Sequence, residues 1–168
     1  RAEHREDFKA RAEQRARANR RQARPLVVVG GARYRSAWHD RLFALACDRV
    51  KFVGGVYEPA LLNGLYANCR AYLHGHEVGG TNPGLLRAMA HGAPVLAVDC
   101  EFNREVAADG GRWFGKEPGA CAALLRQCDG DDALLVALGN HAKARAESAY
   151  RWDDVADGYA ELFRNVAK

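Results

Sequence analysis

The chain has 168 residues, of which 48% are hydrophobic, and its 25 Lys and Arg residues outnumber its 21 Asp and Glu residues. This length favours a single domain with a core of its own, and no stretch approaches the roughly 20 apolar residues that span a membrane. The five cysteines show no C-x-x-C spacing, which argues against a zinc site and a disulfide framework. We therefore predict a cytoplasmic protein, without a signal peptide at its densely charged N-terminus.

The excess of positive charge lies in residues 1–24, which hold nine basic and four acidic side chains. The remaining residues, 25–168, carry 16 basic and 17 acidic groups and form the predicted domain. Ala, Arg, Glu and Gln dominate residues 1–24 and favour helix, so this segment is interpreted as a charged helical arm. An RNA-binding or membrane-surface arm is the alternative. Because the arm lacks interleaved aromatic residues and a hydrophobic face, we predict no nucleic-acid partner and no membrane span.

The domain begins with a strand, a helix and a second strand. The apolar run at 26–29, which follows Pro25, predicts a strand buried on both faces, as in a parallel sheet. The turn after it matches neither G-x-G-x-x-G nor the P-loop pattern, so neither of those sites is supported. Ser36 is expected to cap a helix that runs to about Cys47, with these side chains inward: Leu42, Phe43, Leu45 and Ala46. The second strand covers 50–53 and closes at Gly54-Gly55.

Strands and helices continue to alternate to the end of the chain. Strands are predicted at 71–74, 94–98 and 112–114, and helices at 58–67, between Pro83 and Gly92, and at 102–108, 119–127, 132–147 and 152–166. This order predicts an α/β fold in which helices flank a Rossmann-like parallel sheet. Four aromatic side chains are expected in the core or under the closing helix: Trp113, Phe114, Trp152 and Tyr159. Ligands bind such sheets beyond the carboxyl ends of the strands, where four loops are expected to converge, at 30–31, 54–55, 74–81 and 99–103.

The loop between the third strand and the next helix is the strongest candidate for a ligand site. Gly79 and Gly80 permit a sharp turn, Asn82 or Thr81 can cap the helix, and Pro83 suits its first position. The first amides of the helix, those of Gly84 and Leu85, have no partner within it and can bind a phosphate. A Gly-Gly turn that serves the fold alone is the alternative.

Several segments in this order resemble the C-terminal, donor-binding half of a GT-B glycosyltransferase of family 4. They lie at 26–30, 49–54, 61–67, 74–76 (H-G-H), 79–83 (G-G-T-N-P), 85–97 and 103–106. The resemblance covers about residues 25–165 and is closest to bacterial rhamnosyltransferase-like members that serve surface-polysaccharide biosynthesis. It implies transfer of a sugar from a nucleotide-diphosphate sugar to a saccharide acceptor, with retention at the anomeric carbon and with no metal or other cofactor.

The resemblance also implies roles for individual residues. The donor diphosphate would be held by Gly79, Gly80, Thr81, Asn82, Gly84 and Leu85. The nucleotide and its ribose would lie near Gly30, Gly31, Gly54 and Arg87. His74 and His76 are the candidate catalytic residues, because histidine can donate a hydrogen bond to the sugar or the leaving phosphate. A histidine satisfied by backbone groups is the alternative. Glu77 and Glu105 are placed at the rim, with solvated carboxylates as the alternative reading.

The chain departs from the family in two respects. Arg87 stands where relatives usually place a glutamate, whose carboxylate accepts hydrogen bonds from the ribose; arginine has donors only. Residues 1–24 contain no apolar run that could form the first strand of the family's domain, and no segment is expected to form the acceptor-binding half. We therefore expect either exposed strand edges that require a homodimer or a separate acceptor-binding chain, or a degenerate, non-catalytic interaction module of the same fold.

Overall fold

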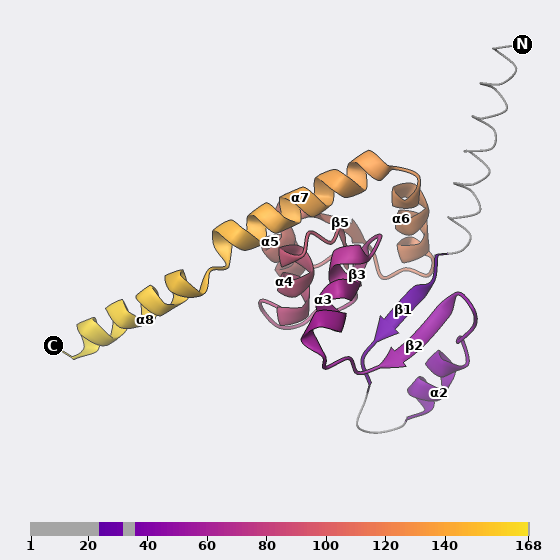
Figure 1. Ribbon diagram of the computed structural model, residues 1–168, viewed down its shortest axis with the longest axis horizontal. Coiled ribbons are helices and arrows are strands. Elements are labelled where there is room, and N and C mark those ends of the chain that lie inside the picture. Colours follow the sequence, from indigo (N-terminus) through magenta and orange to yellow (C-terminus); the bar gives the residue numbers. More distant parts are fainter. Residues whose placement is uncertain (1–23, 32–35, 168) are drawn as a thin grey trace, which may run out of the picture. The chain divides into compact units, whose positions relative to one another are not determined.

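The computed structural model describes residues 24–31 and 36–167, so residues 1–23 of the predicted arm lie outside the described residues. The chain divides into two compact units, residues 1–59 and 60–168, which are described separately (Figure 1). Both units contain parallel strands followed by helices. The predicted α/β class is therefore confirmed.

The first unit contains two strands and one helix in its described part. These are β1 (Leu26–Val29), α2 (Ala37–Phe43) and β2 (Val50–Gly54). β1 and β2 are parallel, with Leu26 opposite Val50. The Ser36 side chain accepts a hydrogen bond from the His39 amide, which confirms the predicted cap. The helix ends at Phe43, earlier than predicted, because the chain turns and the Leu45 amide donates to the Leu42 carbonyl.

The burial predicted for this unit is wrong. Leu26 is 44% exposed, and Phe43 and Leu45 are also exposed rather than inward. The ring centroid of Phe43 does lie 4.9 Å from that of Phe52 on β2, so this pair of rings packs the helix against the strands. Seven residues of α2 cannot cover both faces of two strands, and none of them is buried. The described part of this unit therefore has little core of its own.

The second unit contains the larger sheet and most of the helices. Its strands are β3 (Tyr72–His74), β4 (Val95–Val98) and β5 (Gly111–Phe114). Its helices are α3 (Pro59–Asn68, which begins at the boundary), α4 (Pro83–Ala90), α5 (Glu101–Ala107), η1 (Ala108–Gly110), α6 (Ala120–Asp129), α7 (Asp132–Ala149) and α8 (Trp152–Val166). The strands run parallel in the order β3-β4-β5. Among the described residues, the strands pair as β1-β2 within the first unit and as β3-β4-β5 within the second.

The core of the second unit lies on the two faces of β4, whose four residues are all buried. On one face, Leu85 and Met89 of α4 pack against Val95 and Ala97, together with Ala142 of α7. On the other face, Leu96 packs with Cys128, Leu135 and Leu138 from α6 and α7. Successive side chains of a strand point to opposite faces, so this short apolar strand can bind helices on both sides.

One glycine is required by the packing of this core. Helix α7 contacts α4 and η1, and Gly110 of η1 lies directly against it. A Cβ atom on Gly110 would lie 2.5 Å from the Cα of Ala142, a separation that packed atoms do not tolerate. Gly110 therefore allows the close approach of η1 and α7.

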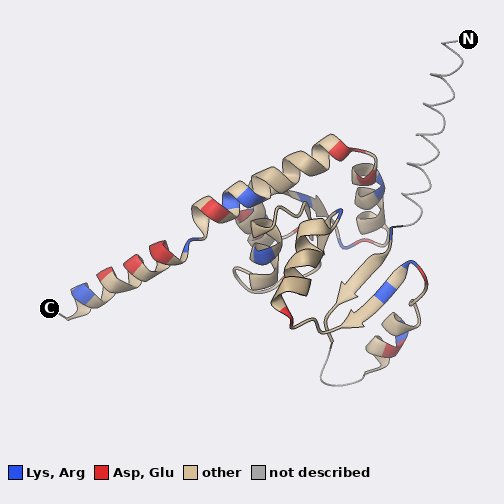
Figure 2. Ribbon diagram, viewed as in Figure 1, with Lys and Arg blue, Asp and Glu red and all other residues tan. Residues whose placement is uncertain are grey.

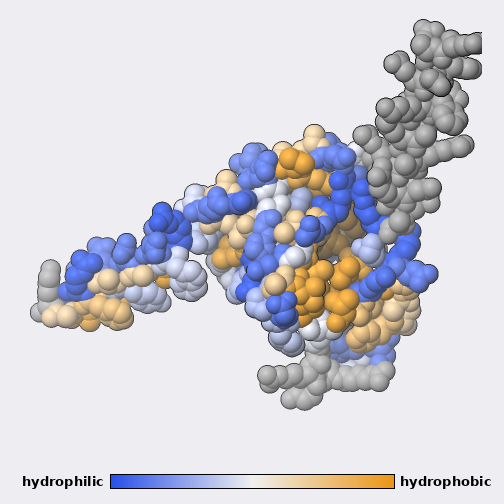
Figure 3. Space-filling view, viewed as in Figure 1, coloured by the Kyte–Doolittle hydropathy of each residue, from blue (hydrophilic) through white to orange (hydrophobic). Residues whose placement is uncertain are grey.

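Helix α8 has the predicted bounds but not the predicted packing. None of its residues is buried; Trp152 is 85% exposed and Tyr159 is also exposed, so their expected core positions are wrong. Its apolar residues gather on one side of the helix and its polar residues on the other (Figure 3). An amphipathic pattern gives a helix a face to bury, but the described residues supply no surface that covers it. Trp113, in contrast, packs against the core as expected.

No helix in the described ranges has the length and apolar character needed to cross a lipid bilayer.

Candidate functional site

The loops after β3 and β4 lie at the same edge of the larger sheet. Their strands are parallel neighbours, with His74 opposite Ala97, so both chains leave the sheet at their carboxyl ends. The buried Asn103, on α5, joins the two loops: its Nδ2 donates to the His76 carbonyl and to the Val98 carbonyl, each at 2.9 Å. Two of the four predicted loops therefore meet here.

The other two predicted loops belong to the first unit and meet one another. The amide of Gly30 donates to the Gly54 carbonyl at 2.8 Å, and both glycines have positive φ. Gly31 follows directly and is exposed. The proposed roles of these glycines at a nucleotide remain predictions.

The loop 75–82 enters α4 through a capped N-terminus. The Oδ1 atom of Asn82 accepts from the amides of Gly84 (2.9 Å) and Leu85 (3.2 Å), and Pro83 is the first helical residue. Asn82 rather than Thr81 is thus the cap. The two amides expected to be free for a phosphate are engaged by this cap, so a phosphate there would have to compete with Asn82 or bind earlier in the loop.

The earlier part of the loop is open. Gly79 has a φ of 100°, which only glycine adopts without strain, and a Cβ on Gly80 would meet no atom within 4 Å. Within the described part of the chain, the structure records no hydrogen-bond partner for the amides of Gly79, Gly80 and Thr81. Three consecutive amides are therefore available to an anion beside the positive end of α4.

His74, the last residue of β3, is buried in spite of its position at the sheet edge. It is 1% exposed, its Nδ1 lies 3.2 Å from the Tyr72 hydroxyl, and its ring stacks on that of His76 at a centroid distance of 5.0 Å. Burial, together with the neighbouring His76, lowers the pKa of His74 to about 4, so the ring is neutral at pH 7. Its Nε2 is buried and has no hydrogen-bond partner among the described residues.

Two ion pairs surround the loop, and their cations were not identified from the sequence. Lys116, after β5, pairs with Glu77 of the loop. Arg104 of α5 donates to both carboxylate oxygens of Asp99 at 2.5 and 2.8 Å and lies over the ring of Trp113. The hydrogen bond from Arg104 lowers the pKa of Asp99, and the hydrogen bond to Glu77 raises the pKa of Lys116. Both pairs are exposed, so each contributes little to stability.

The two remaining candidates are exposed. Arg87 lies on α4, and the structure records no hydrogen bond or ion pair between its side chain and another described residue. The side chain of Glu105 on α5 is likewise exposed, while its carbonyl accepts from Arg145 at 3.2 Å. Asn103 was not identified as a site residue from the sequence. The signal that could have found it is an amide side chain in the first turn of a helix, five residues after a strand ends.

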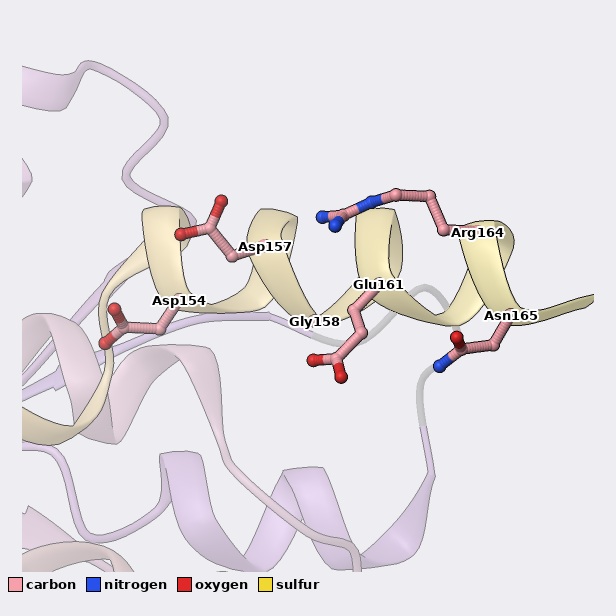
Figure 4. Close-up of a pocket in the computed structure, with 6 residues that line it drawn as sticks. All are labelled: Asp154, Asp157, Gly158, Glu161, Arg164 and Asn165. Atoms are coloured by element: carbon pink, nitrogen blue, oxygen red, sulfur yellow. The ribbon is translucent and has the colours of Figure 1, made fainter.

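A hollow on the surface of α8 is a separate feature. Figure 4 shows its lining residues, all from this one helix: Asp154, Asp157, Gly158, Glu161, Arg164 and Asn165. Acidic residues outnumber basic ones along α8 (Figure 2), which opposes binding of a phosphate there. Among the residues that the structure describes, no cluster of three or more His, Cys, Asp or Glu side chains is arranged to hold a metal ion.

Comparison with known proteins identifies similar families and folds. The family model described as "Glycosyl transferases group 1" matches residues 4–152. No curated protein matches the chain significantly. Among solved structures, a sucrose-phosphate synthase from Thermosynechococcus elongatus has a TM-score of 0.71 at 22% identity, with 90% of this chain covered and 41% of the synthase.

Two further solved structures share the GT-B fold. The Anabaena protein HepE in complex with UDP has a TM-score of 0.67 at 22% identity. The match covers 84% of this chain and 41% of the HepE chain. A GtfA/B complex has a TM-score of 0.66 at 19% identity, and the match covers 84% of this chain and 29% of the chain in the complex. The chain thus spans less than half the length of each of these three proteins.

Proposed function

Because the chain belongs to the glycosyl transferases group 1 family, we propose that it is the donor-binding domain of a glycosyltransferase. In this proposal the loop 75–82 receives the diphosphate of a nucleotide sugar. The observation that carries it is the placement of the buried His74 next to the loop: within the described ranges, neither Nε2 of His74 nor the amides of Gly79, Gly80 and Thr81 have a recorded hydrogen-bond partner. Hydrogen-bond donors left without partners in this way favour a ligand that is rich in acceptor oxygens.

The proposed chemistry is electrostatic. As the bond between the sugar and the diphosphate breaks, negative charge grows on the leaving oxygen, and fixed amides near the N-terminus of α4 would stabilise it. His74 would donate a hydrogen bond as a neutral group. The finer expectations belong to the same proposal: a family 4 enzyme of rhamnosyltransferase-like type, retention at the anomeric carbon, a saccharide acceptor, and no metal.

Two cations beside the loop, Lys116 and Arg104, each pair with a carboxylate. Arg87 of α4 is the candidate-site cation for which the structure records no ion pair with another described residue. We therefore propose that a complementary acceptor-binding half, on a further stretch of polypeptide, a separate chain or a second copy, contributes cations to the bound diphosphate. The partial coverage of the GT-B relatives supports this view.

The second candidate is a degenerate interaction module, and Arg87 is the observation that favours it. Arginine cannot accept a hydrogen bond from a ribose hydroxyl, and each polar group left unpaired in a complex costs of order 1 to 3 kcal/mol. The Arg87→Glu variant separates the candidates. A gain in affinity for nucleotides on this substitution supports a donor site weakened at one position; an unchanged lack of binding supports the degenerate module.

A titration with UDP, UDP-glucose, GDP and dTDP, followed by NMR of the backbone amides, tests the proposal. Gly80→Asp adds a carboxylate to the loop at an open position and should lower the affinity for the preferred nucleotide by at least about tenfold, because two anions would share one site. Gly158→Asp, at an equally open position on α8, is the matched control and should leave the affinity unchanged. Equal affinities for the two variants would exclude the loop as the diphosphate site.

A further inference from the structure

The side chains of Tyr72 and His74 form a hydrogen-bonded pair on one face of β3. Residues two apart on a strand point to the same side, and the Tyr72 hydroxyl lies 3.2 Å from Nδ1 of His74. The pair also lies next to the N-terminus of α4, because a Cβ on Gly84 would be 3.4 Å from the Tyr72 hydroxyl. The pair therefore lies beside the first turn of α4, the helix that follows the proposed diphosphate loop.

The direction of this hydrogen bond follows from counting donors. Burial, with Tyr66 and Cys69 nearby, raises the pKa of Tyr72 to about 12, so its hydroxyl keeps its proton at pH 7. If Nδ1 of His74 carried the ring proton and donated to Tyr72, the tyrosine hydroxyl would have no acceptor among the described residues, and Nε2 would be an unpaired acceptor. If Tyr72 donates to Nδ1 instead, the Tyr72 hydroxyl and Nδ1 satisfy each other, and the proton on Nε2 is the group of this pair that lacks a partner among the described residues.

We infer that Tyr72 holds His74 in the tautomer with its proton on Nε2, and that this buried N–H donates to an acceptor oxygen of the nucleotide-sugar donor. The inference rests on the proposed function for the identity of the ligand. Tyr72 acts here as a positioning residue, because it reaches the ligand only through His74. A phosphate oxygen and a sugar hydroxyl share the required chemistry, and the two are distinguished by the ligands used below.

His76 is the neighbour that stacks on the ring of His74. Its side chain is exposed, and the structure records no hydrogen bond between the His76 ring and another described residue. The backbone carbonyl of His76 accepts from Asn103. Because Nε2 of His74 is buried, a ligand oxygen reaches it only when a neighbouring side chain moves, and movement of the His76 ring would break no hydrogen bond that the structure records.

The test reads the tautomer directly, by NMR of the full chain labelled with 15N at histidine. The His74→Gln variant identifies the His74 signals. The wild type is expected to show the proton on Nε2 in the absence of any ligand. Tyr72→Phe removes the hydroxyl and should shift His74 toward the Nδ1–H tautomer and weaken UDP binding about fivefold, the equivalent of one hydrogen bond. Tyr66→Phe, whose ring packs edge-on against Tyr72, is the matched control and should change neither result.

A second experiment on the same labelled protein compares UDP with UDP-glucose. A change in the Nε2 signal of His74 with UDP assigns the acceptor to the diphosphate, and a change with UDP-glucose alone assigns it to the sugar. A wild-type His74 with its proton on Nδ1 overturns the inference. This result comes from the wild-type protein, so it does not depend on whether a variant folds. Binding of both ligands without any change at His74 overturns it as well and leaves the proposed function intact. A protein with the expected tautomer that binds neither ligand refutes the proposed function and the ligand half of the inference together.

Discussion

Replacement of Asn103 by Ala should loosen the loop that carries the proposed site. The Asn103 amide donates two hydrogen bonds of 2.9 Å from a side chain that is 4% exposed. Loss of one hydrogen-bond partner of a buried polar group costs about 1 to 3 kcal/mol. The two carbonyls that Asn103 binds differ in their access to water. The Val98 carbonyl lies in a buried strand residue and would stay unpaired, whereas the carbonyl of the exposed His76 can regain water. We therefore expect a loss of about 2 to 3 kcal/mol in the free energy of unfolding.

Urea denaturation measures this loss, and amide hydrogen exchange locates it. In Asn103→Ala, exchange should accelerate in residues 75–81 more than in α7, and affinity for UDP should fall. Asn68→Ala is the control: its Nδ2 also donates to a carbonyl, that of Gly64, but at an exposed position, and it should cost less than about 0.5 kcal/mol. An Asn103→Ala variant as stable as Asn68→Ala, or one with unchanged exchange in the loop, would refute the view that Asn103 anchors this loop.

The remaining predictions concern packing and pH. Gly110→Ala should destabilise the protein by about 1 to 3 kcal/mol in urea denaturation, because the new methyl group would meet the backbone of Ala142. Gly64→Ala, at an open helical position, should instead stabilise it by up to about 1 kcal/mol, and the opposite ranking would contradict the packing of η1 against α7. Acidification should also destabilise the protein through His74, because the unfolded residue, with a pKa of 6.5, takes up a proton that the folded one, with a pKa of about 4, excludes. The stability that this histidine contributes is complete above pH 7 and should decline between pH 7 and 4, by about 2 kcal/mol at pH 5. The same urea series on His74→Gln should lack this decline; an equal decline in both proteins would place its origin elsewhere.

Local chemistry made several elements predictable from the sequence. Asn82, Pro83 and Gly92 sit at the cap, the first position and the end of α4, as their conformational preferences require. The bounds of α8 also agree with the sequence prediction. Cap, turn and periodicity signals depend on neighbouring residues only, so they can be recognised without knowledge of the fold.

Burial and long-range contacts were less predictable. An all-apolar run suggested that β1 is buried on both faces, yet Leu26 is exposed, because burial depends on which elements cover the strand. Trp152 of α8 is exposed for the same reason. The pair formed by Glu77 and Lys116 joins residues 39 positions apart, and no sequence spacing connects them.

The candidate site was predicted in part. The sequence indicated the glycine-rich loop and His74, and the structure places them at the carboxyl edge of β3, where Asn103 connects the loop to β4. The engagement of the Gly84 and Leu85 amides by Asn82 was not foreseen, although the cap itself was. A cap and a phosphate use the same amides, and composition alone cannot tell which of the two occupies them.

The measurement that tests the central claim most directly is the amide NMR titration of the folded chain with UDP and UDP-glucose. The proposed donor-binding role predicts saturable shifts that are largest from Gly79 to Leu85, together with a change at His74. Saturable shifts confined to α8 or to the first unit, or no shift at any accessible nucleotide concentration, would contradict it and favour the degenerate interaction module.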